Sequence, residues 1–205
     1  MSFPDFYAAV PRLRVYDPLA DFLGASVDGI VDYGYADAVR LAGHSCPTVA
    51  SAYGLTRQAL LTLYGDELPE RGRVQVEFAG SAGEGTNGVV AAVVSLLTGA
   101  AGEGGFKGLG GQFERRGLLS FGARLPLAIR FHRCDGRGVV DAGVDLSAVA
   151  VDPAIGRLLP RCLAGLADSD EVQRFRALWQ DRVRRILLDH GDDPAVFVIR
   201  RGRFQ

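Results

Sequence analysis

The sequence is poor in the residues that most often carry metal and redox chemistry. Among 205 residues there are three cysteines, three histidines and one methionine. The cysteines, Cys46, Cys134 and Cys162, are odd in number and far apart, which is a poor framework for disulfide bonds and fits a reducing compartment. We therefore expect a cytoplasmic protein whose thiols are free for metal or thiol chemistry.

Long apolar runs and an excess of one charge are also missing. No run reaches the roughly 18 to 20 residues that a membrane-spanning helix needs. The opening segment MSFPDFYAAV lacks the basic and apolar regions of a secretory signal. The net charge of −1 argues against a nucleic-acid partner, because binding through phosphate contacts requires a basic excess. A hydrophobic fraction of 48% is typical of a globular chain.

The periodicity of apolar residues predicts an α+β fold, in which helices pack on a small mixed or antiparallel sheet. We expect a body over residues 1–150, which includes an N-terminal arm of turns and a short helix, and a C-terminal extension over 151–205 packed on the same body. The predicted helices cover residues 37–41, 47–64, 89–98 and 168–190. The predicted strands cover residues 73–79, 125–133, 138–146 and 195–201, and Asp135-Gly136 indicates a hairpin turn between the middle two.

The C-terminal extension contains the most regular amphipathic pattern. Asp168 and Glu171 have the spacing of a capping box, and Gly191 follows the helix end. Its predicted buried stripe consists of Val172, Phe175, Trp179, Val183, Ile186 and Leu187.

A glycine-rich segment between Gly99 and Gly122 shows no periodicity for most of its length. Irregular loops of this length are usually functional or disordered. Lys107, the only lysine, and Arg116 lie in this segment. Either cation could bind a carboxylate or phosphate of a small anionic substrate, or it could be a solvated loop residue. The start of the helix near residues 86–88 is a further potential phosphate site, although no Gly-Lys-Ser/Thr follows the preceding loop.

The stretch LAGHSCPTVA places His44 two residues before Cys46, and Pro47 is suited to the first position of a helix. A thiol at a helix N-terminus is biased toward the thiolate, which is the form that binds metal or attacks a substrate. A neutral imidazole nitrogen of His44 could be a second ligand. Alternatively, Cys46 is a buried cap and His44 a turn residue. His132 and Cys134 repeat the spacing and form a minor metal candidate.

The order of several segments resembles the family of the E subunit of formylmethanofuran dehydrogenase. These are Gly43 to Thr48, a helix, the strand residues Val76-Glu77, a helix ending in Leu97-Thr98-Gly99, a glycine-rich segment and a hairpin. The resemblance covers about residues 37–145. The motif of that family is similar to His-Gly-His-x-Cys-Pro-Gly, and GHSCPT is a divergent form of it. Ala42 replaces the first histidine and Thr48 the final glycine. A second cysteine of the family, near residues 87–89, and a C-terminal cysteine-rich zinc module are absent here.

The resemblance implies metal binding, a cleft and a homodimer. With it, the sequence predicts a site in which His44 and Cys46 bind a divalent metal, zinc first, with iron, nickel or copper as alternatives. Cys46 and Glu77 are the candidate catalytic residues, Glu77 as ligand or base, and Lys107 and Arg116 would bind a small anionic or C1-type substrate. We expect the glycine-rich loop to lie over the site. There are two alternatives. One is a non-catalytic protein that carries a metal or cofactor for a redox enzyme or serves it as an accessory protein. The other is a purely structural homodimer without metal.

Overall fold

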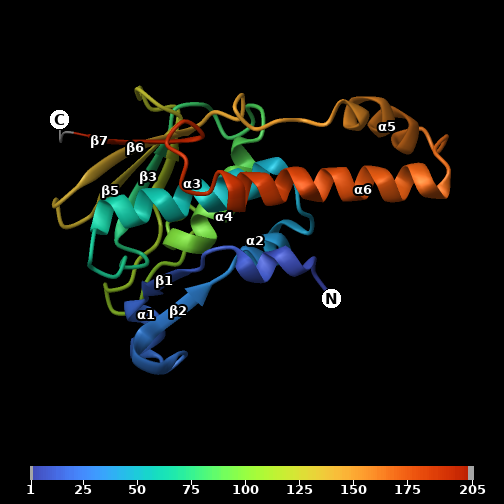
Figure 1. Ribbon diagram of the computed structural model, residues 1–205. Coiled ribbons are helices and arrows are strands. Elements are labelled where there is room, and N and C mark those ends of the chain that lie inside the picture. Colours follow the sequence, from blue (N-terminus) through green and yellow to red (C-terminus); the bar gives the residue numbers. More distant parts are fainter. Residues whose placement is uncertain (1, 203–205) are drawn as a thin grey trace.

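Helix α3 (Pro47–Tyr64) packs across one face of a five-stranded mixed sheet in the computed structural model, which describes residues 2–202 (Figure 1). The strand order is β4-β3-β5-β6-β7, and all neighbours are antiparallel except β3 and β4. The predicted α+β class is therefore confirmed. The strands are β3 (Val74–Phe78), β4 (Leu119–Phe121), β5 (Ile129–Arg133), β6 (Val139–Val144) and β7 (Phe197–Arg201).

Two further helices flank α3, namely α2 (Tyr35–Ala42) and α4 (Asn87–Thr98). Each ends at a glycine with positive φ, Gly43 at 75° and Gly99 at 73°, as expected for helices that stop in the left-handed conformation. The predicted positions of these helices, of α3 and of the β5–β6 hairpin are confirmed.

The N-terminal arm is more ordered than its prolines suggest. Its two short strands pair with each other in a separate antiparallel sheet, which no pattern in the sequence predicts. A short helix precedes them and two more lie between them. In chain order the elements are η1 (Asp5–Ala9), β1 (Leu13–Tyr16), α1 (Pro18–Phe22), η2 (Val27–Gly29) and β2 (Ile30–Tyr33).

The C-terminal extension forms a helical hairpin and then returns to the sheet (Figure 1). Its elements are α5 (Pro153–Leu163), α6 (Ser169–Arg184), the π-helical turn η3 (Arg185–Asp189) and strand β7. The predicted capping box is present, since Glu171 N–H donates to Asp168 and the Glu171 carboxylate accepts from Asp168 N–H. Helix α5, which contains Pro160, was not predicted.

The predicted stripe of α6 is only partly buried. Val183, Ile186 and Leu187 lie in the core, whereas Val172, Phe175 and Trp179 are half-buried. The first turns of α6 extend beyond the sheet and pack against α5 (Figure 1), so part of their apolar surface stays exposed. No helix within residues 2–202 is long and apolar enough to cross a membrane.

The carboxylate of Asp17 joins three distant segments of the chain. It caps α1 by accepting hydrogen bonds from the N–H groups of Leu19 and Ala20. It also pairs with Arg71 at 2.9 Å and with Arg115 at 2.7 Å. Burial by itself raises the pKa of Asp17, but Arg71, the Ala20 N–H and Arg115 outweigh it, so the pKa lies below its ordinary value. The ionised carboxylate thus stabilises the folded state.

We predict that Asp17→Asn lowers the free energy of unfolding by about 3–5 kcal/mol at pH 7, because two partly or fully buried guanidinium groups lose their counter-charge. Because the folded pKa of Asp17 is lowered, its contribution is complete above the unfolded value of about 4 and is lost as the pH falls through the folded value. Urea unfolding at several pH values measures both effects. The exposed Asp66→Asn is the matched control and should leave stability unchanged. A similar loss in both variants would contradict the prediction.

Helix α3 approaches β7 closely at Gly54. A Cβ atom at this position would lie 2.6 Å from Cζ of the buried Phe197 ring. The absence of a side chain therefore lets the helix lie directly on the strand. Gly156 in α5 is also a helical glycine, but apart from the backbone of its own helix and its two neighbours, a Cβ there would have no described atom within 4 Å.

We predict opposite effects of the same substitution at these two glycines. Gly54→Ala should lower the free energy of unfolding, because overpacking costs about 1–3 kcal/mol and exceeds the gain in helix propensity. Gly156→Ala should raise it by about 0.4–1 kcal/mol. Thermal unfolding of both variants tests this pair, and a stabilising Gly54→Ala would refute the close packing.

Candidate functional site

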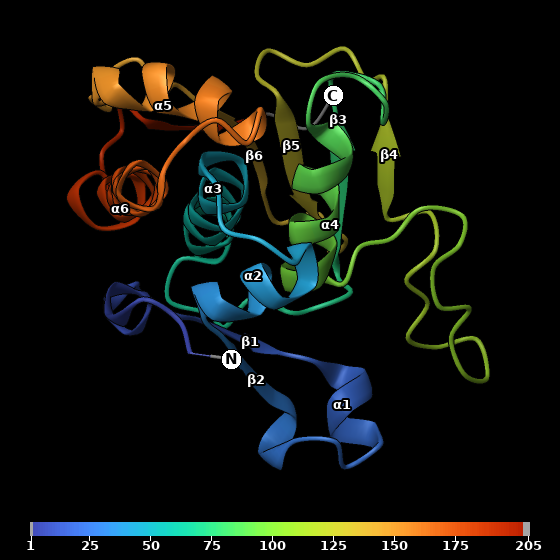
Figure 2. The same ribbon diagram turned by 90° about the vertical axis from the view of Figure 1, so that its right-hand side faces the viewer.

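The His44–Cys46 turn joins α2 to α3 (Figure 2). Gly43 ends α2, and Cys46 is the N-cap of α3 in an extended conformation, directly before Pro47 at the first helical position. The predicted N-cap position of Cys46 is confirmed. Its side chain makes no capping hydrogen bond to the helix, so the sulfur is available for other contacts.

The side chains of His44 and Cys46 converge on each other. Nε2 of His44 lies 3.3 Å from Sγ of Cys46, and Nδ1 lies 2.9 Å from the carbonyl oxygen of Ala42. A carbonyl oxygen only accepts, so Nδ1 carries the proton and Nε2 presents its lone pair to the sulfur. His44 is exposed and Cys46 is half-buried. The pair is therefore accessible to a metal ion or a small molecule.

Residue Ser45, between the two, is held by the C-terminal helix. Its carbonyl oxygen accepts hydrogen bonds from Trp179 Nε1 at 3.1 Å and Gln180 Nε2 at 3.4 Å. Its hydroxyl donates to Gln180 Oε1 at 3.1 Å and lies 2.9 Å from the hydroxyl of Tyr35. Burial raises the pKa of Tyr35, so its hydroxyl remains a donor. The turn is thus fixed from both sides.

The sequence does not reveal this clamp. Trp179 was predicted to belong to a buried stripe, and Ser45, Gln180 and Tyr35 carried no signal. The bonded residues lie up to 135 positions apart, and no periodicity reports a contact across that separation.

A cavity of about 420 Å³ opens beside the first turn of α3. Pro47 and Thr48 of α3 line it together with Thr86 and Asn87 at the start of α4, and Phe78 of β3 forms part of its wall. The N-termini of two helices thus meet at one cavity, directly after Cys46 in the chain.

The structure does not bring Glu77 to this turn. Val76 and Phe78 of β3 are buried in the core, and side chains alternate along a strand, so Glu77 faces the other side of the sheet. There it is aligned with Arg130 of β5 and interacts electrostatically with His132. The expected role of Glu77 as ligand or base is not supported by this position.

The glycine-rich loop also lies elsewhere than expected. It leaves the C-terminal end of α4, and Arg115 and Phe113 anchor it to Asp17 and Phe22 of the N-terminal arm. Figure 2 shows the loop on the side of the molecule away from α6, whereas α6 holds the His44–Cys46 turn. Lys107 is exposed on this loop, and Arg116 pairs with Glu114. Neither cation joins the cysteine and histidine.

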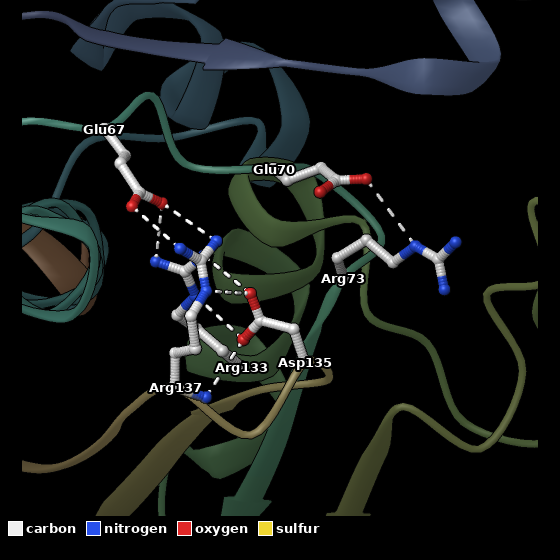
Figure 3. A network of polar contacts seen from close by, with 6 residues as sticks. All are labelled: Glu67, Glu70, Arg73, Arg133, Asp135 and Arg137. Carbon is white, nitrogen blue, oxygen red and sulfur yellow. Dashed lines mark hydrogen bonds and ion pairs between the residues drawn. The ribbon is translucent and has the colours of Figure 1, made fainter.

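A second polar cluster, at the β5–β6 turn, neutralises itself (Figure 3). Arg133 and Arg137 each pair with both Glu67 and Asp135. Arg133 and Arg137 hold the pKa of Asp135 well below its ordinary value. Cys134 is exposed, but partial desolvation of its sulfur raises the pKa of the thiol, which does not favour metal binding there.

No family model matches the sequence. No curated protein matches it either.

We predict that Cys46 reacts faster with iodoacetamide than the more exposed Cys134, because His44 Nε2 lies 3.3 Å from the Cys46 sulfur and can accept its proton, whereas partial desolvation raises the pKa of the Cys134 thiol. His44→Gln should slow alkylation of Cys46 several-fold and leave Cys134 and Cys162 unchanged. Peptide mapping by mass spectrometry over a time course measures all three rates in one sample. Equal rates at Cys46 in both proteins would show that the imidazole does not activate the thiol.

Proposed function

We propose that this chain is a metal-binding protein in which Cys46 Sγ and His44 Nε2 hold one divalent ion at the N-terminus of α3. The 3.3 Å separation of these two atoms carries the proposal. We expect zinc, with iron, nickel or copper as alternatives, and a small anionic or C1-type substrate.

The donor geometry suits a tetrahedral ion. Zinc bonds of about 2.3 Å to sulfur and 2.0–2.1 Å to nitrogen place two tetrahedral ligands about 3.6 Å apart. The observed separation is within a few tenths of an ångström of that value. Metal-binding histidines donate their other ring N–H to an oxygen, as His44 Nδ1 does to Ala42.

The pair leaves coordination positions for other groups. Within residues 2–202, no set of three His, Cys, Asp or Glu side chains lies close enough to hold an ion. We assign the open positions to water, substrate or a second copy of the chain, consistent with the homodimer that the family resemblance implies. A bound ion of this kind supplies Lewis-acid activation of a water molecule or a substrate oxygen.

A metal or cofactor carrier, or an accessory protein of a redox enzyme, is the second candidate function. It is favoured by the positions of Glu77, Lys107 and Arg116, because none of these predicted acid–base or anion-binding groups lies beside the His44–Cys46 pair. In either role we propose a cytoplasmic location, supported by the three free cysteines, Cys46, Cys134 and Cys162.

Elemental analysis of protein purified without a metal-affinity tag tests the proposal. We predict close to one metal ion per chain, or one per two chains if a dimer shares the site. Cys46→Ala and His44→Ala should each remove it, and Cys162→Ala, the matched control, should retain it. Turnover of small anionic substrates separates the enzyme from the carrier. Unchanged metal content in Cys46→Ala would contradict the site.

A further inference from the structure

The cavity beside α3 is polar at one end and apolar at the other. Thr48, Thr86 and Asn87 lie at the helix N-termini, whereas Leu55, Ile129 and Val144 line the apolar part. Among the residues that the structure describes, no charged side chain lines it. A ligand that fits this cavity therefore needs a polar head and an apolar body.

Ser51 belongs to the lining of this cavity and has a buried hydroxyl without a hydrogen-bond partner among residues 2–202. Its side chain lies on the face of α3 that lines the cavity, the residue is 8% exposed, and Oγ has no hydrogen-bond partner within residues 2–202. Two other buried hydroxyls in these helices behave differently, since Thr56 and Thr98 donate to the carbonyl oxygens of Ala52 and Val94, one turn earlier. A buried hydroxyl without a partner is costly, so the free Ser51 group points to a missing acceptor.

The two helix N-termini define the charge of that acceptor. Neither N-cap residue, Cys46 of α3 or Thr86 of α4, makes a side-chain capping bond. The first turns therefore have no side-chain cap, although Asn87 N–H donates to the carbonyl oxygen of Glu84 and Pro47 has no N–H to donate. The helix dipoles give this end of the cavity partial positive charge. Because the described lining contains no basic side chain, an anion of low charge fits better than a phosphate ester with two charges.

We infer that the cavity binds a small monocarboxylate with an aliphatic body. The carboxylate accepts hydrogen bonds from N–H groups at the start of α3 or α4 and from the Ser51 hydroxyl, which is closed off from solvent in the free protein and turns toward the cavity on binding. The aliphatic chain occupies the space beside Leu55, Ile129 and Val144. The inference rests on the proposed function in that it names the class of small anionic substrate. Its residues are nevertheless distinct from His44 and Cys46, which do not line the cavity.

Binding of hexanoate to the metal-free full-length protein, followed by two-dimensional NMR, tests this inference. Hexylamine, of the same length and opposite charge, is the ligand control. We expect saturable shifts with hexanoate only. Ser51→Ala should weaken binding about tenfold or more, the effect of losing a hydrogen bond to a charged group. Its melting temperature should be unchanged or higher, because the hydroxyl has no partner among residues 2–202 in the free protein. Ser95→Ala, in α4 but outside the cavity lining, should bind as the wild type does.

Equal binding of hexylamine, or no hexanoate binding, overturns the inference, as does Ser51→Ala binding equal to wild type. The Cys46→Ala variant separates the two proposals, because it should lose metal and still bind hexanoate. Metal binding without hexanoate binding would refute the cavity assignment alone. Hexanoate binding without metal in the wild type would refute the metal site alone.

Discussion

The packing of α3 on the sheet is the contact on which the rest of the structure depends. Gly54 allows the helix to lie against the Phe197 ring of β7, and the other buried residues of α3 fill the space above β5 and β6. This contact fixes the direction of the helix and therefore the position of its N-terminus. Cys46, the cavity and the start of α4 meet at that end.

The C-terminal extension links the same packing to the turn before α3. Its last strand provides Phe197 to the core, and its long helix provides Trp179 and Gln180 to Ser45. The extension thus stabilises the body at one end of α3 and restricts His44 and Cys46 at the other. Because these contacts hold Ser45 and not its two neighbours, the imidazole of His44 and the thiol of Cys46 remain free to bind. Pre-organisation of this kind lowers the entropic cost of binding.

The local elements could be predicted because their signals are local. Pro47 and Gly65 mark the ends of α3, and Asp168 with Glu171 marks the start of α6. The sequence does not predict the strand pairing of the N-terminal arm or the buried ion pairs of Asp17, because both depend on contacts between distant segments. The same limit applies to the site. The His44–Cys46 contact follows from their spacing, whereas the placement of Glu77 on the far sheet face depends on strand register.

The central claim is that Cys46 and His44 bind one metal ion together, and titration with cobalt(II) tests it most directly. Cobalt replaces zinc in such sites, and a thiolate ligand gives it a charge-transfer band that oxygen and nitrogen ligands do not. The band should saturate at a fixed stoichiometry with proton release, because the thiol must ionise to bind. The fluorescence of Trp179, the single tryptophan, should change in parallel, since its indole contacts Ser45. Absence of the charge-transfer band in the wild-type protein would contradict the claim.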